Sequence, residues 1–151
     1  MSTILDFMGA DHRACDDLFA SAEDAVAKKN WGSARSLFER FQAAMAHHLA
    51  MEEKVLFPAF EARTGMSMGP TQVMRMEHEQ MRGLLQEMAD AVANADHGRY
   101  LGLSETLNML MQQHNLKEEN MLYPMSDQVL AADRDSLIHA MEALPKDAIA
   151  S

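Results

Sequence analysis

Two histidines and a glutamate recur in this sequence 66 positions further on. The first set is His12, His48 and Glu52, and the second is His78, His114 and Glu118. Residues 48–58 and 114–124, which carry part of each set, share five identical residues, and this predicts a duplicated helical hairpin. Imidazole and carboxylate groups are common nitrogen and oxygen ligands of metal ions. The repeated pattern therefore indicates chemistry at a metal centre.

Long helices must position these residues. Seven glycines and four prolines separate long runs of strong helix formers, and no run alternates as a half-buried strand would. Helices are expected over these five ranges: residues 4–29, 33–64, 70–94, 100–123 and, shorter, 126–143. Short connections make long neighbouring helices antiparallel. The prediction for residues 1–151 is a single all-α domain, an up-down-up-down four-helix bundle with a short fifth C-terminal helix.

Each of the four long helices has an apolar stripe at spacings of three and four residues, and the six histidines and glutamates interrupt these stripes near their middle. Six polar groups converging in one core need a partner, because burying an unpaired carboxylate costs several kcal/mol. A metal centre supplies that partner, and a buried hydrogen-bond network without metal is the alternative. The same stripes include Cys15, Met74, Met81, Met88, Met111, Met121 and Met125, which are expected to be core residues.

The composition of the ligand set narrows the metal chemistry. Two imidazoles and one carboxylate in each half suggest two ions, each bound by two histidines and bridged by both glutamates. Nitrogen and oxygen donors without thiolate suit iron or manganese, and zinc and copper stay open. The chain has no Glu-x-x-His of the ferritin-like dimetal proteins, no His-Glu-x-x-His and no cysteine pair, which argues against these other metal motifs.

The ordered pattern of His12, His48 with Glu52, His78, and His114 with Glu118 resembles the hemerythrin-like family, the HHE cation-binding domain. This resemblance implies a four-helix bundle around a non-heme di-iron centre. It assigns one iron to His12 and His48, the other to His78 and His114, and makes Glu52 and Glu118 the bridges. An oxo or hydroxo group is expected to join the two iron ions (Fe2+/Fe3+).

The function implied by this resemblance is binding of, or reaction with, a diatomic ligand (O2 or NO), for sensing, storage or stress response. Iron donation for iron–sulfur centre repair and redox turnover of NO or peroxide are the alternatives, with ligand binding favoured over enzymatic turnover. The oxygen-carrying members have a fifth histidine one turn before the position of His78. Met74 stands there in this chain. We therefore expect an open coordination position and a preference for NO capture over stable oxygenation.

Several other reactive side chains are expected to lie outside the ligand set. The sequence predicts His47 to face solvent or to support the centre indirectly, His97 to lie in a turn and His139 off the apolar side of its helix. Glu53 and Glu119 are expected to point outward, where they either orient a ligand histidine or face water. Tyr123 could approach the site from the end of the fourth helix, and core packing is the favoured assignment.

The net charge of −10 disfavours nucleic acid and anionic membranes as partners. The single cysteine excludes an internal disulfide, and no apolar stretch is long enough to span a membrane. The start of the sequence lacks the features of a secretory signal. The expected location is the cytoplasm.

Overall fold

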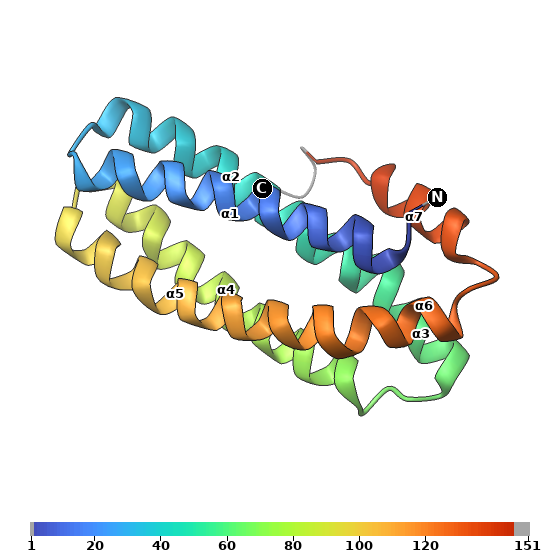
Figure 1. The fold of residues 1–151 in the computed structure, drawn as a ribbon. Coiled ribbons are helices and arrows are strands. Elements are labelled where there is room, and N and C mark those ends of the chain that lie inside the picture. Colours follow the sequence, from blue (N-terminus) through green and yellow to red (C-terminus); the bar gives the residue numbers. More distant parts are fainter. Residues whose placement is uncertain (1, 147–151) are drawn as a thin grey trace.

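The computed structural model describes residues 2–146, and all regular secondary structure in that range is helical. Four long helices lie side by side: α1 (Ile4–Ala27), α2 (Trp31–Met51), α4 (Pro70–Ala93) and α5 (His97–Lys117). Helix α1 packs against α2 and α5, while α4 packs against α5 and α2, so the four form a closed bundle (Figure 1). The predicted all-α bundle is confirmed.

The duplication is visible in the turns at one end of the bundle. The α1–α2 turn contains Lys29 with φ 57°, and the α4–α5 turn contains Ala95 with φ 50°. These residues are 66 positions apart, the offset of the sequence repeat. Both turns place a residue with a Cβ in the left-handed region, which lets two long helices reverse direction through very few residues. The two hairpins therefore share a backbone design as well as a residue pattern.

Both hairpins also contain a π-helical turn that begins at the repeated glutamate. The segments are η1 (Glu52–Leu56) and η2 (Glu118–Leu122). The N–H of Phe57 donates to the carbonyl of Glu52, and that of Tyr123 to the carbonyl of Glu118, each across five residues. A proline follows each of these donors in the chain, and its missing N–H makes the wider turn easier to accommodate. Such turns are often found at functional sites.

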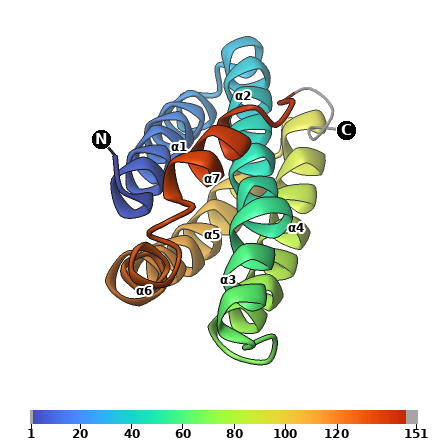
Figure 2. The ribbon, with the colours of Figure 1, turned by 90° about the vertical axis from the view of Figure 1, so that its right-hand side faces the viewer.

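Helices α3 (Phe57–Thr64), α6 (Tyr123–Val129) and α7 (Arg134–Glu142) form the other end of the molecule, seen end-on in Figure 2. The predicted end of the fourth segment and the predicted start of the short fifth segment are wrong. Helix α6 continues the fourth segment through Pro124 to Val129, because a proline in the first turn of a helix lacks only an N–H that would be unpaired there. The fifth helix begins at Arg134 instead of residue 126.

The buried apolar side chains form two clusters. One fills the bundle towards the α1–α2 and α4–α5 turns and contains Phe19, Phe41 and Met88, and the other lies towards α3, α6 and α7 and contains Met8, Phe57 and Met141. The repeated histidines and glutamates lie between them. Most predicted core methionines are buried, but Met121 is 60% exposed, because the π-helical turn in η2 rotates it away from the stripe.

Candidate metal centre

The structure brings the six predicted ligands together in the middle of the bundle. Donor atoms of Glu52, His78, His114 and Glu118 lie within 4.8 Å of one another, and so do donor atoms of His12, His48 and Glu118. The six side chains come from α1, α2, η1, α4, α5 and η2. None of the six residues is more than 4% exposed. Two adjoining groups of nitrogen and oxygen donors therefore share Glu118.

A carboxylate holds the outer nitrogen, Nδ1, of each of the four imidazoles. The four distances are 2.8 Å for His12–Glu119, 2.6 Å for His48–Asp11, 2.7 Å for His78–Glu53 and 2.8 Å for His114–Glu77. An ionised carboxylate only accepts hydrogen bonds, so each Nδ1 carries the hydrogen. This arrangement directs each Nε2 towards the centre and raises its basicity, as partners of metal-binding histidines do.

These four carboxylates also follow the repeat. Asp11 corresponds to Glu77, and Glu53 corresponds to Glu119, in each case 66 positions apart. Of the two predicted roles for Glu53 and Glu119, the structure supports the orientation of a histidine. Sequence reasoning did not assign this role to Asp11 and Glu77. The signal that could have found them is the acidic residue directly before both His12 and His78.

Several inner donor atoms face one another without hydrogen bonds, whereas Nε2 of His12 lies within hydrogen-bond distance of Oε1 of Glu118, at 3.0 Å. Nε2 of His78 lies 3.0 Å from Oε1 of Glu52, and Nε2 of His114 lies 3.2 Å from Oε2 of Glu118. These four atoms and Nε2 of His48 have no hydrogen-bond partner within residues 2–146. Buried acceptors that point at one another are costly unless something satisfies them. Protons on the imidazoles can satisfy them in the metal-free chain, and a metal cation bound by all of them satisfies them as well, so the donor set fits a metal.

The centre binds protons strongly in the metal-free chain. Burial lowers the pKa of His12, but the carboxylates of Glu118 and Glu119 outweigh it and raise the pKa to about 9. The pKa of His78 is likewise raised to about 9, because Glu52 and Glu53 outweigh the effect of burial. A metal must therefore displace protons at neutral pH.

Tyr123 breaks the symmetry of the centre and combines the two positions expected of it, in the core and at the site. Its side chain is fully buried, as expected of a core residue, but its hydroxyl lies in the site. The oxygen is 2.7 Å from Oε2 of Glu52, 2.9 Å from Oε1 of Glu118 and 3.3 Å from Nε2 of His12. The equivalent residue in the other half is Phe57, whose ring stacks on His78 at 5.6 Å between centroids. The surroundings of His12 and of His78 therefore differ by one hydroxyl group.

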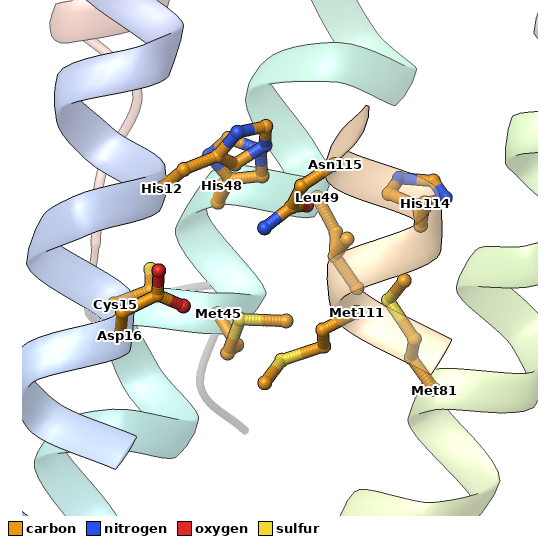
Figure 3. Close-up of a pocket in the computed structure, with 10 residues that line it drawn as sticks. All are labelled: His12, Cys15, Asp16, Met45, His48, Leu49, Met81, Met111, His114 and Asn115. Atoms are coloured by element: carbon orange, nitrogen blue, oxygen red, sulfur yellow. The ribbon is translucent and has the colours of Figure 1, made fainter. Parts of the chain in front are cut away.

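A small cavity adjoins the centre on the side of the bundle turns (Figure 3). Its lining residues come from all four long helices: His12, Cys15, Asp16, Met45, His48, Leu49, Met81, Met111, His114 and Asn115. Four of them carry sulfur, and the pairs Cys15 with Met81 and Met45 with Met111 again follow the 66-residue repeat. The walls next to the donor atoms are therefore mostly apolar.

The remaining histidines lie outside the centre. His47 is not solvent-facing as one reading of the sequence held: it is 6% exposed, and its Nε2 lies 3.2 Å from the carbonyl of Leu144. His97 is the first residue of α5 and does not lie in a turn, while His139 is exposed on α7. Met74 is 3% exposed and belongs to the apolar cluster that contains Phe57.

Comparison with known proteins agrees with this geometry. The family model of the hemerythrin HHE cation-binding domain matches residues 3–126. The chain therefore belongs to the hemerythrin HHE cation-binding family. The buried histidine and glutamate cluster has the donor groups that could hold a metal ion.

Individual relatives are more distant. The chain is 30% identical over 90 residues to the iron-sulfur cluster repair protein YtfE of Escherichia coli O1:K1 / APEC, and to the proteins of the same name from E. coli strain SMS-3-5 / SECEC and Escherichia fergusonii. Each match covers 53% of this chain and 40% of the relative, so the chain spans about two fifths of the curated relatives it matches. No solved structure matches the chain. Within residues 2–146, no helix has the length and apolar character that crossing a membrane requires.

Proposed function

We propose that this protein binds two iron ions and uses them to bind, or react with, a diatomic ligand such as O2 or NO. His12 and His48 hold one ion, His78 and His114 hold the other, and Glu52 and Glu118 bridge them. The observation that carries this proposal is the cluster of buried donor atoms, five of which have no hydrogen-bond partner in the described part of the chain. Glu118 belongs to both donor groups, as a bridging carboxylate must.

The residues around the centre suit a small ligand. Iron bound there would supply the redox and ligand-binding chemistry for O2 or NO. The sulfur-containing side chains of Met45, Met81 and Met111 line the cavity beside the donor atoms and make this part of its wall apolar. The hydroxyl of Tyr123 can donate a hydrogen bond at the opposite face of the centre. The chain thus offers an apolar approach and one placed donor.

Metal analysis of the reconstituted protein tests the dinuclear centre. We expect about two iron ions per chain in the wild type, and loss of both in Glu118→Ala, because this carboxylate contacts both donor groups. Glu142→Ala, a change on the short helix α7, is the matched control and should retain both ions. One ion per chain in the wild type, or loss of a single ion in Glu118→Ala, would contradict the bridged arrangement.

Iron donation for the repair of iron–sulfur centres is the second candidate, and the likeness to the iron-sulfur cluster repair protein YtfE favours it. A donor should lose iron rapidly to a chelating acceptor, whereas a ligand-binding protein should retain iron and bind O2 or NO reversibly. Transfer of iron to a chromogenic chelator, followed in the presence and absence of NO, distinguishes the two.

A further inference from the structure

Any opening from solvent into the cavity beside the candidate metal centre must lie at its partly exposed lining residues. Of its ten lining residues, eight are buried, and only Asp16 on α1 and Asn115 on α5 are partly exposed (Figure 3). Such an opening therefore lies between α1 and α5. Gln112 of α5 spans it from outside, since its side-chain amide donates to Oδ1 of Asp16 at 3.3 Å.

The repeat relates the α1/α5 junction to the junction of α4 and α2, and this second junction is closed. Leu49, which is 1% exposed, replaces Asn115 in the repeat, and Arg82 replaces Asp16. The guanidinium of Arg82 donates to both oxygens of Glu53, at 3.0 Å and 2.7 Å, and so covers the junction of α2 and α4. Only the α1/α5 junction thus places polar, partly exposed side chains at the outer end of a path to the buried donor atoms.

Carboxylates surround this path. Asp11, with a side chain 31% exposed, lies on α1 with Asp16. Glu119, with a side chain 35% exposed, lies in η2, which directly follows α5. Their negative charges reach the path, because Glu119 contributes to the raised pKa of Asp16, and Asp11 and Asp16 contribute to that of Cys15, in both cases after the larger effect of burial. At the inner end, Nε2 of His48 and Nε2 of His114 have no hydrogen-bond partner in the described part of the chain.

We propose that the α1/α5 opening is the route by which divalent metal cations reach the centre, with Asp16 and Asn115 as its positioning residues. The inference rests on the proposed metal site and adds its loading path. A carboxylate at the mouth of a low-dielectric path attracts cations and raises their local concentration. The oxygens of Asp16 and of Asn115 replace part of the water shell of the ion before the imidazoles bind it.

Stopped-flow loading of the metal-free full chain with Co2+, followed by its visible absorption, tests this route. Asp16→Asn removes the charge at the mouth, and Asp17→Asn is the matched control, because Asp17 is an exposed neighbour that does not line the cavity. At low salt we expect Asp16→Asn to load about threefold or more slowly. Asp17→Asn should be slowed less: after the larger effect of burial its charge also contributes to the raised pKa of Asp16, but its side chain is exposed and lies outside the cavity lining. The final amount of bound metal should be equal in all three proteins.

A second variant tests the opening itself. Asn115→Leu introduces at the α1/α5 junction the residue type, leucine, that stands at the closed α2/α4 junction. This variant should slow metal loading about tenfold at any salt concentration. The effect of Asp16→Asn should instead shrink as the salt concentration increases. Equal loading rates for Asp16→Asn and Asp17→Asn, or wild-type loading by a folded Asn115→Leu, would overturn the proposed route. Failure of the wild type to bind Co2+ would instead overturn the metal site.

Discussion

The hydroxyl of Tyr123 should contribute measurably to the stability of the metal-free protein. The side chain is fully buried, and its oxygen lies 2.7 Å from Glu52 and 2.9 Å from Glu118. Burial, followed by the charges of Glu118 and Glu52, holds the pKa of Tyr123 well above 10, so the hydroxyl keeps its proton at neutral pH. Tyr123→Phe removes this donor and leaves the ring in place.

The expected loss follows from the kind of bond removed. A hydrogen bond to a charged group contributes about 1.5–3 kcal/mol, and the carboxylates left behind stay buried without water. Tyr100→Phe is the matched control, because Tyr100 is also fully buried but its hydroxyl has no hydrogen-bond partner within residues 2–146. Removing an unpaired buried hydroxyl should leave stability unchanged or raise it slightly.

Urea unfolding with a chelator present measures both variants. A loss of about 2 kcal/mol corresponds to a midpoint lowered by roughly 1 M for a slope near 2 kcal/mol/M. We expect this shift for Tyr123→Phe and none for Tyr100→Phe. If the two variants unfold at the same urea concentration, the hydroxyl of Tyr123 is not a stabilising donor, and its place in the centre must be reconsidered.

Three further outcomes are expected. Glu53→Gln should weaken metal binding by about 10- to 100-fold in a chelator competition, because His78 loses the carboxylate that orients it. Glu61→Gln should cost about 0.5–1 kcal/mol of unfolding free energy at pH 7 and almost nothing at pH 3 in urea unfolding. Burial raises the pKa of Glu61, but the hydrogen bonds to this carboxylate, including that from Arg75, outweigh burial and lower the pKa below its ordinary 4.5. The stabilising contribution is therefore present above pH 4.5 and is lost on acidification. Metal affinity should rise from pH 7 to 9 in the same competition, because protons leave His12 and His78 near pH 9.

The repeat in the sequence predicted most of the metal site. Histidine and glutamate interrupt the apolar stripes at equal depth in both halves, and helical periodicity then requires that they meet in the bundle axis. The family match confirms the bundle, and the structure places all six predicted donors together. Their division between two ions stays a prediction, since donor geometry alone does not count ions.

Features that depend on local helix geometry could not be predicted in the same way. The π-helical turn of η2 changes the directions in which the side chains of Met121 and Tyr123 point, relative to a regular α-helix. As a result the hydroxyl of Tyr123 enters the centre and Met121 faces solvent. The helix break before Arg134 carries no glycine or proline between residues 130 and 133. It depends on how α7 packs across η1 and α1, which is a tertiary effect.

The differences between the two halves all concern the surroundings of the donors, while the donors themselves are repeated. Phe57 stacks on His78, whereas Tyr123 brings a hydroxyl to His12. The partly exposed Asp16 lines the cavity on the His12 side, whereas Arg82, which replaces it in the repeat, is bound to Glu53. An ion held by His12 would therefore have a nearby hydrogen-bond donor and the proposed path to solvent, and an ion held by His78 would be enclosed by apolar and paired side chains. We infer that the duplicated frame builds the centre and that substitutions in one half make its two sides chemically unequal.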